Sequence, residues 1–563
     1  MMLRFSGKRK AKQQKRSPLR YSALSVLLLV MLVASACASW GTKAPPASTP
    51  TPTAKQLCAH AYRQANPIAA ENACPGSDGW HLDHPVGPEN AIEAFVAPAS
   101  VNAGESLQLY VTTTAARYFF QIYRMGYYQG HGGRLIYTSP QLPGVNQPAP
   151  IIDPTTRMVS CDNWSLSATI HTDKSWVSGV YIIKLLSSLG FMRYTLFIVR
   201  NDASTAPIAM QIPFITYQAY NRWGDHNLYR GLDSNGQYTY DDRSYAVSFD
   251  RPYNGDPNLY DANAGLGDFP LYDFELLNWL EKSAYNLTYF ADIDVDQNAS
   301  LASSRKLIII SGHSEYWSTQ LRNNVTQARD KGTSLAFFGA NDVYWHVRLA
   351  SSPLGADRIV ICYKSAALDP LAQTDPLATT VRWEDPPLND PEASLIGQEY
   401  GGGVAVTAAL TLNTGSQPFL SGTQLQVGSS FPGLVGGEYD RVAHVGSPAG
   451  LSVIAASVLQ CVPTDQCPTN NMDVTSATIY QAKSGAEVFD AGTFQWSWGL
   501  SDLRIAPTTS SAGQDVLPIT GSATQQFASP DSLATQTSAP DYSDPRFQQL
   551  TANIIAYLLI ASK

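Results

Sequence analysis

The stretch LIIISGHSEYW, residues 307–317, joins a short apolar run to a polar end. Four consecutive aliphatic residues, 307–310, are typical of a strand that is buried on both faces. A helix is expected to follow, with Ser318 as its N-cap and Gly332 at its end. The run Leu335-Ala336-Phe337-Phe338 then predicts the next buried strand. Strand–helix–strand order of this kind favours a parallel sheet covered by helices.

The sequence on either side extends this pattern into two domains. Residues 203–563 continue the alternation, and further elements are expected at 208–215, 273–285, 287–290, 486–489 and after Asp544. Within this range, the turn-rich region around 375–475 is interpreted as a β-rich insertion. Residues 90–202 instead carry short β-branched and aromatic runs separated by Gly, Pro, Asn and Ser, which is typical of a sandwich. We therefore predict an immunoglobulin-like (Ig-like) β-sandwich followed by an α/β three-layer domain.

The first 37 residues are expected to direct export. Residues 4–20 carry eight basic residues and no acidic one, and an apolar run follows at 23–34. That run is shorter than the roughly 20 residues needed to span a bilayer, and small residues lead directly to Cys37. We expect a lipoprotein-type signal segment, with a lipid on Cys37 and the chain anchored to the outer face of the cell membrane. The alternatives are ordinary cleavage with secretion, or an uncleaved anchor.

Charge and cysteine content agree with this extracytoplasmic location. Setting aside the eight basic residues takes the formal net charge from −8 to −16, which argues against nucleic acid as a partner. Residues 38–56 form a Pro/Thr/Ser-rich tether, and 57–89 a short Cys-containing cap. Six cysteines besides Cys37 permit disulfides outside the cytoplasm. Short separations suggest two pairs and leave a third possible one: Cys58–Cys74, Cys461–Cys467 and Cys161–Cys362.

Polar side chains follow two strands that we expect to be neighbours. His313 and Glu315 come after the first strand, and Asn341 follows the second. Functional groups in open α/β sheets gather beyond the carboxyl ends of strands, so these three residues are candidates for one site. The alternative interpretation is that they cap helices and pair with one another.

The same segments offer no nucleophile. The stretch 312–316 lacks the second glycine of a G-x-S-x-G nucleophile elbow, and Asn341 stands where a thiol amidotransferase would need cysteine. Cys362 lies in an apolar stretch and is expected to be buried or disulfide-bonded. Water is therefore the expected attacking group, which requires a metal ion or a general base.

Six motifs follow one another along the chain: G-x-Y-x-G-x-G-G-R (126–134), T-Y-Q-A-Y-N (216–221), V-S-F-D-R-P-Y (247–253), G-H-S-E-Y-W (312–317), G-A-N-D-V-Y-W (339–345) and G-A-E-V-F-D-A-G-T-F-Q-W-S-W-G-L (485–500). Together they resemble the N,N-dimethylformamidase large-subunit family over roughly residues 90–560. The resemblance implies a β-sandwich beside an α/β domain of the class I glutamine amidotransferase-like type. It also implies hydrolysis of small amides at a ferric iron (Fe3+) held by two tyrosines and one glutamate.

Carried over residue by residue, the resemblance implies Glu315 and Tyr220 as iron ligands. The second tyrosine is placed at Tyr229, with Tyr253 as the alternative. Phenolate and carboxylate are hard anionic oxygen donors, which suit ferric iron better than zinc. Three protein ligands leave open positions, where a metal can polarise an amide carbonyl and lower the pKa of a bound water.

The resemblance also implies residues for the chemistry around the metal. His313 matches a histidine beside the glutamate ligand, Asn341 a polar residue of the pocket, and Glu438 a further acidic group. His313 or Glu438 would take the proton of the attacking water. Asn341 would donate a hydrogen bond to the developing oxyanion.

A competing interpretation is a non-enzymatic cell-surface binding protein. Tyr127, Tyr128, Tyr217 and Trp223 would then form an aromatic platform for a glycan or a peptide. Bound iron with open positions would favour the enzyme, and a metal-free crevice with an intact aromatic surface would favour the binding protein. The oligomeric state stays open, with a homo-oligomer among the alternatives, as does the need for a small partner subunit.

Overall fold

The computed structural model describes residues 58–81, 87–88, 90–254, 265–464, 466–501, 503 and 542–562. All of them belong to one compact unit, residues 53–563. The expected signal segment 1–37, with Cys37, and the tether 38–56 lie outside the described residues. Within the described ranges, no helix is both long enough and apolar enough to cross a membrane.

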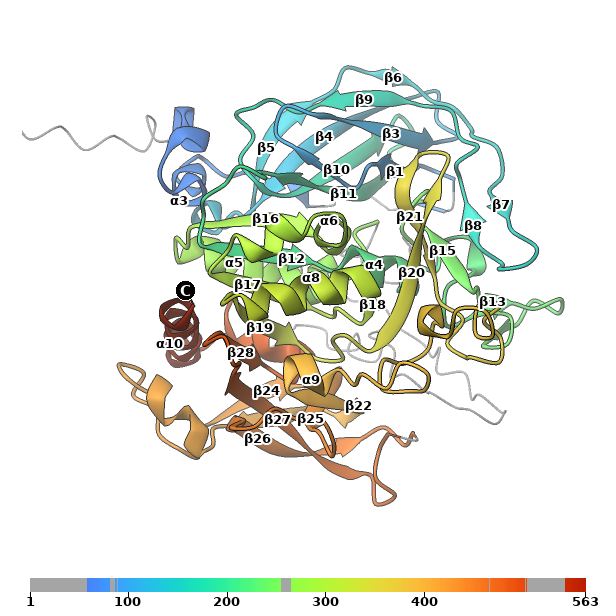
Figure 1. Cartoon of the computed structure of the whole chain (residues 1–563). Helices are drawn as coiled ribbons and strands as arrows, with labels where there is room; N and C mark the ends of the chain where they lie inside the picture. The colour runs from blue at the N-terminus through green and yellow to red at the C-terminus, as the bar shows by residue number, and fades with distance from the viewer. Residues whose placement is uncertain are drawn as a thin grey trace, which may run out of the picture. The chain divides into compact units, whose positions relative to one another are not determined.

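Two sheets that share one core form the first part of the chain (blue to teal in Figure 1). Apolar residues alternate along β3 and β4, so Leu107 and Leu109 pack in the same cluster as Phe120 and Ile122. One sheet has the order β1-β3-β9, and the other β2-β11-β10-β4-β5 with β6 beside β4. The strands are β1 (Glu93–Ala97), β2 (Ser100–Asn102), β3 (Ser106–Thr112), β4 (Arg117–Met125), β5 (Gly133–Thr138), β6 (Leu142–Pro143), β9 (Ala168–His171), β10 (Gly179–Ser187) and β11 (Met192–Arg200), with a separate pair β7 (Ile151–Ile152) and β8 (Val159–Ser160).

A nine-stranded sheet dominates the rest of the chain, in the order β16-β12-β17-β19-β28-β27-β26-β22-β25. The first five strands are parallel, and the last four join in antiparallel pairs. Strands from the β-rich region around 375–475 therefore extend the same sheet. The bounds are β12 (Ile208–Ile212), β16 (Leu287–Ala291), β17 (Leu307–Gly312), β19 (Ser334–Gly339), β22 (Gln398–Val406), β25 (Glu438–Val442), β26 (Ser452–Cys461), β27 (Met472–Gln481) and β28 (Glu487–Asp490).

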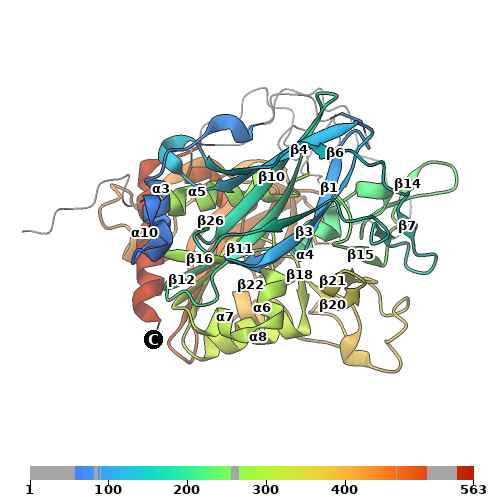
Figure 2. The ribbon, with the colours of Figure 1, turned by 90° about the horizontal axis from the view of Figure 1, so that it is seen from above.

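Helices and short strands surround this sheet. Helices α6 and α8 lie together in both views (Figures 1 and 2), and α7 packs beside them (Figure 2). The helices are α3 (Pro67–Asn72), α4 (Phe214–Tyr220), α5 (Phe274–Lys282), α6 (Asp292–Gln297), α7 (Ala299–Ser303), α8 (Thr319–Asp330), α9 (Ala393–Ile396) and α10 (Pro545–Ala561). The small sheets contain β13 (Gly231–Leu232) with β14 (Tyr238–Thr239), β23 (Ala408–Thr411) with β24 (Ser430–Val435), and β15 (Ala246–Ser248), β21 (Gly355–Ile361), β20 (Trp345–Ser352) and β18 (Tyr316–Ser318) in that order.

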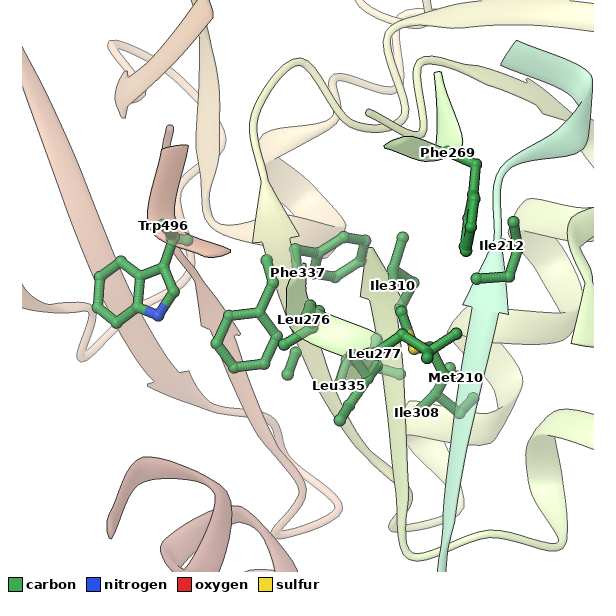
Figure 3. Packing of buried hydrophobic residues seen from close by; sticks show 14 of the residues in the cluster. Met210, Ile212, Phe269, Leu276, Leu277, Ile308, Ile310, Leu335, Phe337 and Trp496 are labelled. Atoms are coloured by element: carbon green, nitrogen blue, oxygen red, sulfur yellow. The ribbon is translucent and has the colours of Figure 1, made fainter. Parts of the chain in front are cut away.

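Buried side chains from strands and helices fill the core of this part (Figure 3). Ile308 and Ile310 of β17 lie in one cluster with Leu335 of β19 and with Leu276 and Leu277 of α5. The predicted strands at 307–310 and 335–338 are confirmed. So is the helix after Ser318, whose side chain accepts a hydrogen bond from the Leu321 N–H, as an N-cap should.

Two details of the sequence analysis need correction. The strand expected over 208–215 ends at Ile212, because Pro213 breaks it and helix α4 begins at Phe214. The disulfides Cys58–Cys74 and Cys461–Cys467 are confirmed. The third candidate pair is wrong, since Cys161 and Cys362 are both free and buried.

A buried carboxylate fastens the short cap to the other two parts of the chain. Glu281 of α5 accepts hydrogen bonds from Arg124 of β4 at 2.7 and 2.9 Å, from Tyr289 of β16 at 2.8 Å and from Asn72 of α3 at 2.7 Å. Both members of the Arg124–Glu281 pair are fully buried. Such a pair holds its surroundings in one arrangement, because losing either partner leaves an unpaired buried charge.

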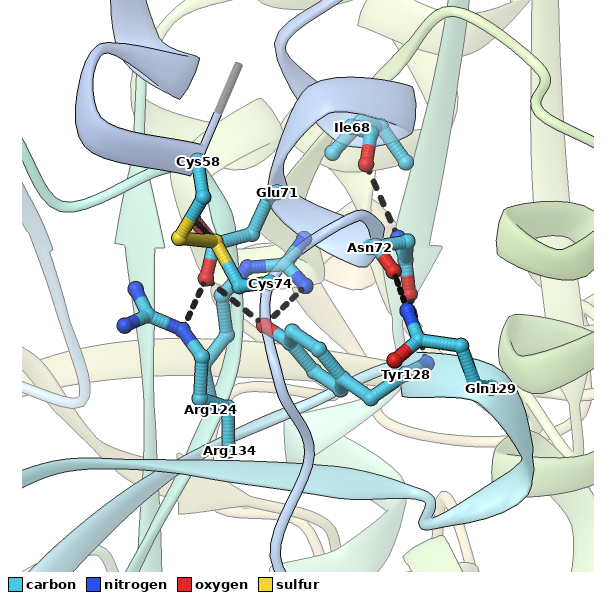
Figure 4. The surroundings of a disulfide bond; sticks show 9 residues. All are labelled: Cys58, Ile68, Glu71, Asn72, Cys74, Arg124, Tyr128, Gln129 and Arg134. Carbon is cyan, nitrogen blue, oxygen red and sulfur yellow. Dashed lines mark hydrogen bonds and ion pairs between the residues drawn. A yellow bond between two sulfur atoms is a disulfide. The ribbon is translucent and has the colours of Figure 1, made fainter. Parts of the chain in front are cut away.

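The disulfide of the cap lies beside a second group of this kind (Figure 4). Glu71 accepts hydrogen bonds from Arg134 Nε at 2.7 Å and from the Tyr128 hydroxyl at 2.9 Å. Tyr128 is fully buried, so the glycine-rich turn around it directs this ring inward. The disulfide Cys58–Cys74 therefore closes the cap on itself, and the hydrogen bonds of Glu71 hold the cap to the sandwich.

Candidate metal centre

Three neighbouring strands bring the candidate residues together. Strand β12 leads into α4, which ends at Tyr220; β17 leads to His313 and Glu315; and β19 leads to Asn341. The strands are parallel neighbours in the order β12-β17-β19, so their carboxyl ends meet at one edge of the sheet. This is the position at which open α/β sheets bind their ligands.

The centre of the site is the Glu315 carboxylate, which is fully buried. Its Oε2 atom accepts a hydrogen bond of 2.6 Å from the Tyr220 hydroxyl, and its Oε1 atom one of 2.7 Å from the Tyr229 hydroxyl. The two hydroxyl oxygens lie 2.9 Å apart, and both rings are half-buried. Oxygens from three side chains therefore converge on one point.

Close to Glu315 lie His313, Glu438 and Asn341. His313 Nε2 lies 3.3 Å from Glu315 Oε2 and 3.4 Å from Glu438 Oε2. Asn341 Nδ2 donates to Glu438 Oε2 at 2.8 Å and lies 3.2 Å from His313 Nε2. The Asn341 Oδ1 atom is buried and has no hydrogen-bond partner among the described residues. A glutamate, a histidine and an amide thus form a buried polar cluster next to the three oxygens.

Burial and neighbouring charges shift the titration of this group. Burial raises the pKa of Glu438 to about 7. Burial acts to lower the pKa of His313, but the hydrogen bond to Glu315 and the charges of both glutamates raise it to about 9. Burial and the nearby carboxylates raise the pKa of Tyr220 and of Tyr229. Without a cation the two tyrosines therefore stay protonated, and their hydroxyls donate hydrogen bonds to Glu315.

Three residues of the site were missed by the sequence analysis. Tyr316 donates to the Tyr229 hydroxyl at 2.5 Å and accepts from Lys364 Nζ at 2.7 Å. The Lys364 ammonium lies 3.2 Å from the centre of the Tyr229 ring, a cation–π contact. Tyr400 donates to Glu438 Oε1 at 3.1 Å. Tyr316 lies in the G-H-S-E-Y-W motif and could have been identified as a site residue from it. Lys364 and Tyr400 come from segments that carry no such motif.

The other tyrosines named from the sequence lie elsewhere. The ring of Tyr253, the alternative second ligand, packs against Tyr217 at 6.4 Å, and no contact joins it to Glu315 in the described residues. The aromatic platform is not supported, because Tyr128, Tyr217 and Trp223 are only 0%, 2% and 7% exposed. Their rings stabilise the interior and cannot form a binding surface.

The metal-binding capacity of the site depends on tyrosine. In the described part of the chain, no group of three or more His, Cys, Asp or Glu residues is arranged to hold a metal ion. The site instead offers two phenol oxygens and a carboxylate, and hard donors of this kind suit a hard cation such as Fe3+.

The fold and the site define a β-rich protein with a buried tyrosine–carboxylate centre at the end of a parallel sheet. The profile of the family "N,N-dimethylformamidase beta subunit-like, C-terminal" matches residues 119–511. The chain therefore belongs to the N,N-dimethylformamidase beta subunit-like family, as its motifs predicted. Membership of this family suggests a dimethylformamidase-like hydrolase.

Other comparisons add little. No curated protein matches the chain. A superoxide reductase (neelaredoxin) from Ignicoccus hospitalis shares 13% identity with a TM-score of 0.12, covering 20% of this chain and 78% of that one. A cycloisomaltooligosaccharide glucanotransferase of Paenibacillus sp., complexed with cycloisomaltoheptaose, shares 9% identity with a TM-score of 0.15, covering 66% and 60%. Both TM-scores are too low to support a conclusion.

Thr216 should contribute to stability by holding the backbone of Glu315. Its hydroxyl, fully buried, accepts a hydrogen bond of 3.0 Å from the Glu315 N–H. Thr216→Val removes the acceptor, and leaving that N–H unpaired should lower the free energy of unfolding by about 1–3 kcal/mol. Thr216→Ser keeps the hydroxyl and should cost less. Urea denaturation followed by circular dichroism measures both; a valine variant as stable as the wild type would contradict this role.

Proposed function

We propose that the protein is a metal-dependent hydrolase of small amide C–N bonds that uses ferric iron. The observation that carries the proposal is the convergence of the Tyr220, Tyr229 and Glu315 oxygens, within 2.6–2.9 Å of one another, in a chain of the dimethylformamidase-like family. Tyr229 is preferred to Tyr253 as the second tyrosine ligand, because only Tyr229 contacts Glu315 among the contacts described above.

The donor set fits the ion. In the ion-free protein the two hydroxyls share their protons with the carboxylate, so a cation that displaces both protons would meet two phenolates and one carboxylate. A trivalent ion would compensate these three negative charges. Tyr220 and Tyr229 are half-buried whereas Glu315 is fully buried, which supports access from solvent past the two tyrosines.

When bound, Fe3+ would supply Lewis acidity toward the amide carbonyl and toward water. The protein's own groups handle the protons. Glu438 would accept the proton of the attacking water at Oε2, and its pKa of about 7 suits a general base near neutral pH. Asn341 Nδ2 and the Tyr400 hydroxyl hold this carboxylate in place. His313, 3.4 Å from Glu438, has a pKa raised to about 9 and therefore carries a proton near neutral pH, which it can donate to the departing amine.

Asn341 is proposed to act on the substrate oxygen. One of its two amide N–H groups is used by Glu438 at 2.8 Å. When His313 Nε2 carries a proton, it cannot accept the second Asn341 N–H, which is then available to the developing oxyanion. The same asparagine would thus orient the base and stabilise the negative charge that the base helps to create.

Iron content and visible colour test the ligand set. Residues 38–563, purified after growth with iron, should carry about one iron per chain and a tyrosinate-to-iron charge-transfer band. Tyr220→Phe, Tyr229→Phe and Glu315→Ala should lose iron and colour, because each removes a donor oxygen. Tyr253→Phe is the matched control and should keep both. A wild type without stoichiometric iron, or colour that survives the three ligand changes, would defeat the proposal.

Hydrolysis rates test the proton-handling residues separately from the metal. His313→Gln and Glu438→Gln should each lower kcat for a small amide such as N,N-dimethylformamide by about 10²–10⁴-fold, the range typical of general acid–base catalysis. Iron content should stay at the wild-type level in both. His171→Gln, at an exposed histidine of strand β9 in the first part of the chain, is the control and should change nothing. Wild-type rates in both site variants would remove these residues from the mechanism.

The finer description of the fold is also a proposal. The two sheets that share a core over residues 93–200 support an Ig-like sandwich. The five parallel strands β16-β12-β17-β19-β28 support a three-layer domain of the amidotransferase-like type. We further propose that nucleic acid is not a partner, which the negative net charge supports.

We propose that the protein is a lipoprotein on the outer face of the cell membrane, anchored through Cys37. Two disulfides, Cys58–Cys74 and Cys461–Cys467, support an oxidising, extracytoplasmic compartment. In cells fed radiolabelled palmitate, the wild-type chain should become labelled and the Cys37→Ser variant should not, because only the thiol of this cysteine would receive the lipid. Equal labelling of both chains, or of neither, would contradict lipidation at Cys37.

A further inference from the structure

A second buried carboxylate lies directly behind the proposed metal centre. Asp273 is fully buried and ends a π-helical turn, η6 (Phe269–Asp273), that precedes α5. Turns of this kind are rare and occur frequently at functional sites. Asp273 accepts hydrogen bonds on both oxygens, from the Ser311 hydroxyl to Oδ1 and from the Tyr217 hydroxyl to Oδ2.

The two hydrogen-bond donors lie on different segments, each of which carries residues of the proposed metal centre. Tyr217 lies in α4, three residues before Tyr220, so both side chains lie on neighbouring turns of the same helix face. Ser311 lies in β17, two residues before His313. The Asp273 carboxylate therefore bridges the segment that carries the first tyrosine and the segment that carries the histidine and Glu315.

The backbone of β17 is pressed against this carboxylate. Gly312 has a φ of +64°, and a Cβ atom placed there would lie 2.8 Å from Asp273 Oδ1 and 2.8 Å from the Tyr272 Cβ. Only glycine accepts both the conformation and the close approach without strain. The turn also reaches His313 through an aromatic contact, since Phe494 packs on Tyr272 at 4.7 Å and on His313 at 4.6 Å.

We propose that Asp273 is a positioning residue of the metal centre: by binding Tyr217 and Ser311 together, it fixes the distance between Tyr220 and Glu315. The inference rests on the proposed iron site and goes beyond its ligands. A simpler structural role would stabilise the fold without affecting the metal. Measurements on the bound iron distinguish the two roles. A change in the spacing of the ligands alters iron affinity and the energy of the tyrosinate-to-iron transition, whereas a loss of stability alone does not.

Four variants and one control separate these roles. Tyr217→Phe and Ser311→Ala each remove one hydroxyl, and Asp273→Ala removes the bridge. Asp273→Asn keeps one acceptor oxygen and serves as a partial rescue. Tyr289→Phe is the control: it also removes a buried tyrosine–carboxylate hydrogen bond of the α/β part, from Tyr289 to Glu281, away from the site. The readouts are iron affinity by competition with a chelator, the position of the charge-transfer band and the thermal unfolding midpoint.

The expected loss of iron affinity is about tenfold for Tyr217→Phe, Ser311→Ala and Asp273→Asn, and about a hundredfold for Asp273→Ala, as for residues that orient metal ligands. The band should shift in all four and stay unshifted in Tyr289→Phe, even though that control also loses stability. If Asp273→Ala fails to fold, the two hydroxyl variants decide the question. Unchanged affinity and an unshifted band in both would overturn the inference.

The same experiment distinguishes this inference from the proposed function. A wild-type protein that binds no iron would contradict both the proposed function and the role of Asp273. A wild type that binds iron, with variants that bind it equally well, would remove only the role of Asp273. Iron binding that weakens in the variants, in a protein that hydrolyses no amide, would leave the role of Asp273 standing and remove the hydrolase.

Discussion

The two hydrogen bonds that Glu315 receives from Tyr220 and Tyr229 are the interaction on which the rest of the site depends. An ionised carboxylate that is fully buried is costly unless charged or polar partners replace its water. Here two phenol hydroxyls and His313 do so. The two tyrosines lie 95 and 86 residues before Glu315 in the sequence, so the parallel strands must first bring their carboxyl ends to one edge of the sheet.

This arrangement also explains how one set of atoms can serve two states. Without a cation, the phenol protons satisfy the Glu315 carboxylate. With a cation, the same oxygens would become its ligands once those protons leave. The separation of α4 from the end of β17 matters to the proposed site, because Tyr220 and Glu315 lie on these two segments. Thr216 supports that separation by accepting a hydrogen bond from the Glu315 N–H, and we assign part of it to Asp273.

Local sequence patterns predicted several of the strands and helices that carry the site. The elements and residues that were not predicted depend on tertiary contacts. The strand at 307–310 and the helix after Ser318 were predictable, since continuous apolar runs and N-caps are local signals. Helix α4 was not, because its apolar start continues that of β12 and only Pro213 separates them. His313 and Asn341 followed from the strand-end rule.

Residues that reach the site from elsewhere lacked such a signal. A lysine is ordinarily solvated, so nothing in the sequence marks Lys364 as a residue packed on the Tyr229 ring. Tyr400 comes from a strand of the β-rich region, whose place in the sheet the sequence did not predict. The pairing of Cys161 with Cys362 was reached only by elimination, and two cysteines left over after the short-range pairs need not be close in the fold.

X-ray diffraction at the iron absorption edge, from crystals of the iron-loaded protein, tests the central claim most directly. The account predicts one anomalous peak within bonding distance of the Tyr220 and Tyr229 hydroxyl oxygens and of the Glu315 carboxylate, with Tyr253 outside that distance. An iron peak at any other set of residues, or no peak after loading, would contradict it.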